Sequence, residues 1–86
     1  MIFEFTETRC ILEILGILNA RNSKYSEMFK KIKVSHTTLQ SVLRKLVQKQ
    51  FVIKHNLGHQ NVSYELTSKG KELLEILLQL YRLVKD

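Results

Sequence analysis

The sequence contains no proline, no tryptophan and only one cysteine, Cys10. A single cysteine excludes a framework of internal disulfide bonds, which stabilises many small secreted domains. No apolar run approaches the roughly 18 residues of a membrane-spanning helix, and the first residues lack the basic and apolar regions of a signal peptide. We therefore expect a cytoplasmic protein, or one in the host cytoplasm if the source is a virus, with no membrane partner.

Signatures of catalysis and metal binding are also missing. The three glycines form no phosphate-binding loop, and Cys10 has no second cysteine with which to form a metal or redox motif. His55 and His59 have the spacing of metal ligands on a helix, but Gly58 between them indicates a turn. These absences predict that the protein is not an enzyme and has no catalytic residue, metal or cofactor. We interpret Cys10 as a buried structural thiol, with an intersubunit disulfide as the alternative.

Acidic residues are absent from the middle of the chain. The net charge is +6, and residues 28–64 contain seven Lys and Arg residues but no Asp or Glu. In the two flanking segments cations and anions nearly cancel, so the excess positive charge lies almost entirely in this central segment. Charge segregated in this way produces a positive field over one part of the molecule, which predicts a polyanionic partner.

The order of the predicted elements is three helices, a β-hairpin and a fourth helix. Apolar residues recur at steps of three and four over residues 11–18, in a shorter helix that begins near Ser26, and over residues 35–49. Few residues join the second and third helices, so these helices must cross at a steep angle. Alternating apolar residues on either side of Gly58 predict two short strands. The chain length, residues 1–86, predicts a single domain.

The last predicted helix, residues 67–86, has apolar residues on most of its circumference. A domain of this size cannot bury all of them, so we expect this helix to form the interface of a homodimer. The alternative is a core helix of the monomer. Residues that recur along this helix at alternating steps of three and four, as in a coiled coil, are the candidates for the interface. Tyr81 is added to them. These residues are Leu73, Leu77, Leu80, Tyr81 and Val84.

This order of elements resembles the winged helix-turn-helix domain of the MarR, PadR and ArsR transcription regulators. It is most similar to small archaeal and archaeal-virus winged-helix proteins that end in a dimerising helix. The segments that match are "SEMFKKIKVSHTTLQSVLRKLVQKQFVIK" and "YELTSKGKELL". The second contains the pattern Tyr64, Leu66, Thr67 and Gly70, which is a fairly specific signature of these families.

The resemblance implies an α+β fold that is mostly helical, with three helices, a two-stranded wing and a long C-terminal helix. It also implies a transcriptional regulator that binds double-stranded DNA as a homodimer. MarR-type regulators are longer and use additional helices to form an effector pocket, so we expect no small-molecule effector here.

The sequence departs from the family pattern at two places. Gln50 stands where these families commonly have a glycine with a positive φ, so either Gln50 adopts that conformation or the turn differs. The tip of the wing, which contains His59, Gln60 and Asn61, has no arginine that could enter the minor groove.

The resemblance makes residues 35–49 the recognition helix, which would lie in the major groove. The exposed side of this helix presents hydroxyls, amides and cations, and these groups can bind base edges or phosphates. The alternative is an ordinary solvated helix face. Candidates for base contacts are Thr37, Thr38, Gln40, Ser41, Arg44 and Lys45. Candidates for phosphate or wing contacts are Lys24, Lys30, Lys31, Lys33, Ser35, His36, Lys49, Lys54, His59, Gln60 and Asn61.

The sequence therefore favours a regulator that binds specific sequences of duplex DNA. Two alternatives remain open. One is a non-specific chromatin or architectural DNA-binding protein. The other is a winged helix used only for protein contact, in which the basic face meets an acidic protein surface.

Overall fold

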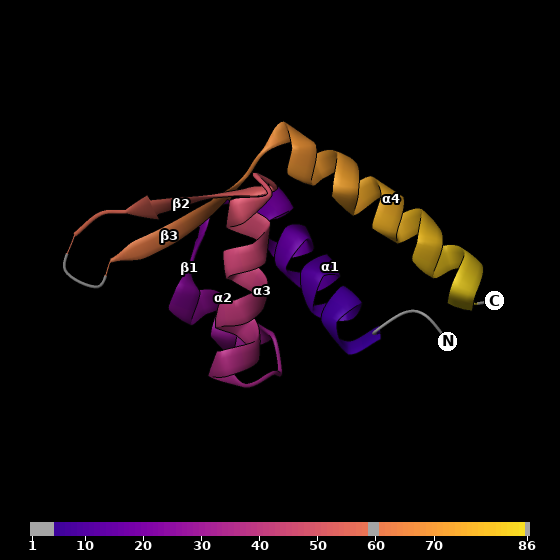
Figure 1. The fold of residues 1–86 in the computed structure, drawn as a ribbon, viewed down its shortest axis with the longest axis horizontal. Helices are drawn as coiled ribbons and strands as arrows, with labels where there is room; N and C mark the ends of the chain where they lie inside the picture. The colour runs from indigo at the N-terminus through magenta and orange to yellow at the C-terminus, as the bar shows by residue number, and fades with distance from the viewer. Residues whose placement is uncertain (1–4, 59–60, 86) are drawn as a thin grey trace.

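The computed structural model describes residues 5–58 and 61–85 (Figure 1). Three helices pack together, a β-hairpin extends from one side of them, and a long last helix lies beside the first. In chain order the elements are α1 (Phe5–Ala20), β1 (Ser23–Lys24), α2 (Tyr25–Lys31), α3 (His36–Gln48), β2 (Val52–Asn56), β3 (Val62–Leu66) and α4 (Ser68–Lys85). The predicted mostly helical α+β architecture is confirmed. No helix in the described ranges is both long enough and apolar enough to cross a membrane.

The sheet has three strands, so the prediction of a two-stranded wing is wrong by one strand. Its order is β1-β3-β2, and both pairings are antiparallel. β1 contains only Ser23 and Lys24, which pair with Tyr64 and Ser63 of β3. Two residues are too few to show the alternation that identifies a strand in a sequence. The strand leads directly into α2, which begins at Tyr25, one residue before the predicted start near Ser26.

The third helix was predicted over residues 35–49, and the structure confirms it over His36–Gln48 with a cap residue at each end. The side chain of Ser35 accepts a hydrogen bond from the backbone N–H of Thr38 at 3.2 Å, which satisfies one of the free donors of the first turn. One side of α3 is buried, and its apolar residues recur at helical spacing. These residues are Leu39, Val42, Leu43 and Leu46.

The chain leaves α3 through Gln50, which has a φ of 66°. The backbone N–H of Gln50 donates to the Val47 carbonyl at 3.0 Å, and that of Phe51 donates to the Leu46 carbonyl at 2.9 Å. This is the hydrogen-bond pattern of a helix that ends in a left-handed residue, where glycine is usual. Gln50 therefore adopts the glycine conformation, and the first of the two alternatives posed by the sequence is correct.

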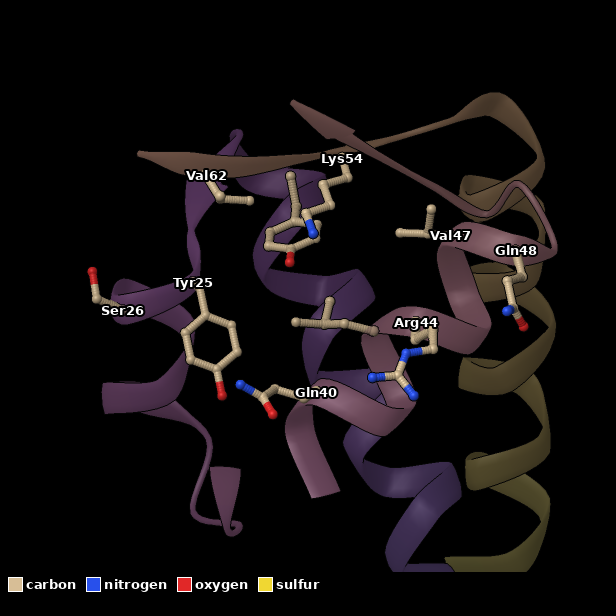
Figure 2. Close-up of a pocket in the computed structure, with 10 residues that line it drawn as sticks. Tyr25, Ser26, Gln40, Arg44, Val47, Gln48, Lys54 and Val62 are labelled. Carbon is tan, nitrogen blue, oxygen red and sulfur yellow. The ribbon is translucent and has the colours of Figure 1, made fainter. Parts of the chain in front are cut away.

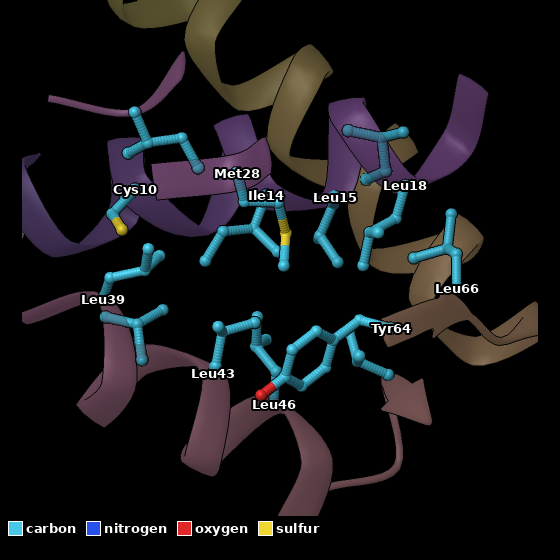
Figure 3. Close-up of a cluster of buried hydrophobic side chains, with 14 of the residues drawn as sticks. Cys10, Ile14, Leu15, Leu18, Met28, Leu39, Leu43, Leu46, Tyr64 and Leu66 are labelled. Atoms are coloured by element: carbon cyan, nitrogen blue, oxygen red, sulfur yellow. The ribbon is translucent and has the colours of Figure 1, made fainter. Parts of the chain in front are cut away.

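The core lies between α1, α3 and the sheet, and α4 closes one side of it (Figure 3). Ile14 and Leu15 of α1 and Leu39 of α3 are completely buried. The first turns of α4 lie so close to the end of α3 that a Cβ atom at Gly70 would overlap the carbonyl oxygen of Phe51. The core thus holds α3 by its apolar side and leaves the opposite side exposed to solvent.

Candidate nucleic-acid interface

The exposed face of α3 consists of polar and cationic side chains. Thr37, Gln40, Arg44 and Gln48 are exposed, and Ser41 between them is half-buried. These residues lie on the helix side opposite the buried leucines, because the helical repeat separates the two sets. Four of the six predicted base-contacting residues, Thr37, Gln40, Ser41 and Arg44, thus share one accessible face.

A groove of about 820 Å³ separates this face from the wing (Figure 2). In Figure 2, Arg44 extends from α3 and Lys54 extends from β2 toward the same open space. None of the lining residues is acidic, so both cations face solvent without a carboxylate on the groove wall. The lining residues are Tyr25, Ser26, Gln40, Leu43, Arg44, Val47, Gln48, Lys54, Val62 and Tyr64.

The groove contains polar groups that the sequence did not identify as site residues, namely Tyr25, Ser26 and Tyr64. Burial raises the pKa of both tyrosines above the ordinary value of 10.0, and the charge of Tyr25 adds to the effect on Tyr64. Both phenols therefore stay neutral at physiological pH and keep their O–H donors. Such donors suit a partner whose surface offers oxygen acceptors.

His36, a predicted phosphate contact, packs against α2 within the helix-turn-helix. Its ring stacks on Phe29 with centroids 3.7 Å apart, and the Tyr25 ring lies 5.8 Å away and nearly parallel. The Tyr25 hydroxyl and His36 Nδ1 are hydrogen-bonded at 2.9 Å. These contacts join α2 to the first residue of α3, so aromatic packing fixes the start of α3.

The two remaining candidates for base contact, Thr38 and Lys45, lie at the edge of α3. The Thr38 hydroxyl accepts from the Ser35 hydroxyl at 3.0 Å, as part of the helix cap. Lys45 Nζ forms an ion pair with Glu7 Oε1 of α1 at 3.0 Å. Both candidates thus have partners within the protein, which the other four do not show among the described contacts.

The lysines predicted as phosphate contacts are distributed around the helix-turn-helix, and all are exposed. Lys30, Lys31 and Lys33 lie at the end of α2 and in the following turn, Lys24 lies in β1, and Lys49 caps α3. Lys31 and Lys33 also line a second cleft of about 530 Å³, together with Arg9, Glu13 and Val34. Only Lys54 of this set joins the groove beside α3.

The described part of the wing tip is a tight turn. The Asn61 N–H donates to the Gly58 carbonyl at 2.7 Å, and the Leu57 N–H donates to the Asn61 carbonyl at 2.8 Å. Gly58 has a φ of 90°, as its place in the turn requires. The candidates His59 and Gln60 lie outside the described residues. His55 pairs with Glu65 of the neighbouring strand at 2.7 Å.

Cys10 is buried in the core with 1% of its surface exposed. Burial raises the pKa of its thiol to about 11, and the charges of Glu13 and Glu7 contribute in the same direction. The interpretation of Cys10 as a buried thiol is confirmed. A disulfide to a second subunit would require this side chain to leave the core.

The predicted interface residues of α4 differ in burial. Leu77 is 9% exposed and belongs to the core, and Leu73 and Leu80 are half-buried against it. Tyr81 is half-buried, and its hydroxyl has no hydrogen-bond partner among the described residues. Val84 is exposed, as are Ile76 and Leu83, which the prediction did not include.

The tight turn between α2 and α3, the exposed polar face of α3 and the hairpin beside it define a class of protein, the winged helix-turn-helix proteins. The model of the winged helix-turn-helix family matches residues 6–85. The chain belongs to this family, and the resemblance identified in the sequence is confirmed.

Known relatives agree with this assignment. An uncharacterised HTH-type transcriptional regulator of Methanocaldococcus jannaschii is 31% identical over 83 residues, which cover 90% of this chain and 76% of the relative. A structure from Streptococcus mutans has a TM-score of 0.86 at 23% identity, over 99% of this chain and 87% of that chain. A PadR-family transcription regulator from Clostridium difficile has a TM-score of 0.80 at 23% identity, over 88% of this chain and 90% of that chain. At these identities the two structures show a common fold.

Proposed function

We propose that this protein is a transcriptional regulator that binds double-stranded DNA, with α3 in the major groove. The observation that carries the proposal is the exposed face of α3, which is free of carboxylates and continues into the groove between Arg44 and Lys54. A duplex presents phosphates at the groove edges and donor and acceptor groups on its base pairs. The regulator from Methanocaldococcus jannaschii supports the same assignment.

The side chains at the centre of α3 suit direct base contacts. The arginine side chain can bridge O6 and N7 of guanine, and the glutamine side chain can bridge N6 and N7 of adenine. Arg44 and Gln40 are the residues of α3 to which we assign these roles, with Thr37 and Ser41 beside them. Lys54 and the hydroxyl of Ser26, on the other walls of the groove, are assigned to the phosphate backbone.

The protein acts as a homodimer in this proposal, with α4 as the interface. Leu73, Ile76, Leu80 and Leu83 recur at steps of three and four along α4, and Ile76 and Leu83 are 61% and 80% exposed. A second copy paired along this stripe would cover the two exposed side chains by apolar packing. A two-fold dimer would also present two copies of α3 to successive half-sites, about 34 Å apart.

Fluorescence anisotropy with labelled duplexes tests DNA binding. We expect the affinity to fall steeply with salt, because each neutralised phosphate releases counterions. The Arg44→Ala variant should bind a selected sequence about 5- to 100-fold more weakly, the cost of one bidentate base contact. Lys71→Ala, which removes an exposed charge from α4, is the matched control and should bind like the wild type.

Selection from a random duplex library separates specific from architectural binding. An enriched palindrome supports a dimeric, sequence-specific regulator. Tight binding without enrichment would favour the architectural alternative, and no binding at low salt would favour a winged helix used for protein contact.

A further inference from the structure

Within residues 5–58 and 61–85, the carboxylate that the contacts place beside the polar face of α3 comes from a distant part of the sequence. Glu7 lies in the first turns of α1 and precedes the acid-free segment 28–64, but α1 packs beside α3 (Figure 1). Its Oε1 atom is 3.0 Å from Nζ of Lys45. A carboxylate thus stands at the edge of a surface that otherwise carries cations, hydroxyls and amides.

Lys45 belongs to the polar face of α3 but is held at its edge by this ion pair. It follows Arg44 directly, so the helical repeat turns it toward α1 rather than toward the groove that Arg44 lines. The side chains of Lys45 and Glu7 remain 55% and 37% exposed. An ion pair with this exposure contributes little stability, because water and salt screen it. A phosphate oxygen of a nearby duplex can therefore compete with Glu7 for the ammonium group.

Glu7 also opposes a duplex directly. The carboxylate and the phosphates carry charges of the same sign, and DNA that covers α3 brings phosphates to both edges of the helix. The repulsion and the loss of the ion pair act on any duplex, whatever its sequence, because neither involves a base edge.

We propose that Glu7 restrains DNA binding by holding Lys45 against α1 and repelling the phosphate backbone, so that non-specific duplex is bound more weakly. The inference rests on the proposed function, since it requires a duplex on the face of α3. In the free protein Lys45 is paired with Glu7. In the complex Lys45 turns to a phosphate, and Glu7 loses its partner.

The Glu7→Gln variant tests the restraint, with Glu75→Gln on α4 as a control that changes the net charge equally. Anisotropy titrations with a random-sequence duplex should show about two- to five-fold tighter binding for Glu7→Gln. The slope of log affinity against log salt should stay close to that of the wild type, because Lys45 contacts a phosphate in both complexes. Glu75→Gln should match the wild type in both measurements.

A double-mutant cycle with Lys45→Gln identifies the lysine as the group that is released. In the Glu7→Gln background, Lys45→Gln should weaken binding more than it does in the wild type, because Lys45 there gives up no ion pair when it binds a phosphate. In both backgrounds Lys45→Gln should lower the salt slope by about 0.9, the loss of one phosphate contact. Circular dichroism at the titration temperature verifies that each variant is folded.

Unchanged or weaker binding by a folded Glu7→Gln variant would overturn the restraint while leaving DNA binding intact. Equal tightening by Glu75→Gln would also overturn it, since net charge would then be the cause. If the wild type fails to bind duplex at low salt, the proposed function itself is wrong, and the role of Glu7 is rejected with it.

Discussion

The hydroxyl of Thr67 donates a hydrogen bond to the carbonyl oxygen of Gln50 at 2.8 Å, and so joins the residue before α4 to the left-handed end of α3. The same hydroxyl lies 3.0 Å from the carbonyl oxygen of Phe51 and accepts from the N–H of Gly70 at 3.0 Å. The end of α3 and the start of α4 are thus one connected unit. Changes at this junction should alter stability without touching the polar face of α3.

Replacing Gln50 by glycine should stabilise the protein. A residue with a side chain in the left-handed region costs about 1–2 kcal/mol, and glycine avoids most of this cost. We expect a gain of about 1 kcal/mol in the free energy of unfolding, measured by urea denaturation. Lys49→Gly is the control, because Lys49 has a negative φ of −91° and gains nothing from glycine. A destabilised Gln50→Gly variant would show that the Gln50 side chain makes a favourable contact larger than the backbone cost.

Alanine at the two helical glycines of α1 and α4 should have opposite effects. At Gly70 a Cβ atom would overlap the Phe51 carbonyl, so Gly70→Ala should destabilise the protein by about 1–3 kcal/mol. At Gly16, in the middle of α1, nothing lies within 4 Å of the added Cβ, and alanine should stabilise the helix by about 0.5–1 kcal/mol. Thermal melts of the two variants should move in opposite directions. Similar shifts for both would contradict the close approach of α4 to Phe51.

Cys10 should be unreactive in the folded protein. Its thiol is buried and its pKa is raised to about 11, so almost no thiolate is present at pH 8. Labelling with a thiol reagent should be slow under native conditions and fast in urea. The pKa of this thiol is 9.0 in the unfolded chain and about 11 in the folded protein. The contribution of Cys10 to the free energy of unfolding should therefore be lost as the pH rises from 9.0 to 11. Rapid labelling of native protein would contradict the burial.

The sequence predicted the parts of the fold that repeat over many residues. α3 has a capping serine and apolar residues at every helical turn, so its position and its exposed face could be derived. The two-residue β1 has no such pattern. The groove beside α3 was also missed, because Tyr25, Lys54 and Tyr64 come from three separate elements that only the tertiary structure brings together.

Two further features depend on long-range packing. The partner of Lys45 is 38 positions away in the sequence, and no local pattern predicts that pairing. The apolar circumference of α4 allowed several orientations, so the sequence could not identify which stripe faces the core. The structure buries Leu77, which the sequence placed in the dimer interface, and exposes Ile76. The interface that we propose is therefore rotated about the axis of α4 by part of a turn relative to the predicted one.

This orientation of α4 gives a prediction that separates folding from dimerisation. Ile76 and Leu83 are exposed in the protomer, so the double variant Ile76→Glu, Leu83→Glu should fold but remain monomeric, because carboxylates would lie within the dimer contact. Leu77→Glu places a charge in the core and should unfold the chain. Size-exclusion chromatography with light scattering gives the mass, and circular dichroism gives the helix content.

Glu72→Gln, Gln79→Glu is the control for surface changes on α4, because both residues are exposed and polar. It should keep the mass and helix content of the wild type. A dimeric Ile76→Glu, Leu83→Glu variant would show that the two copies associate through another surface. A folded dimer of Leu77→Glu would contradict the packing of α4 against α1, since a buried carboxylate at that position would have no charged partner in the apolar core around it.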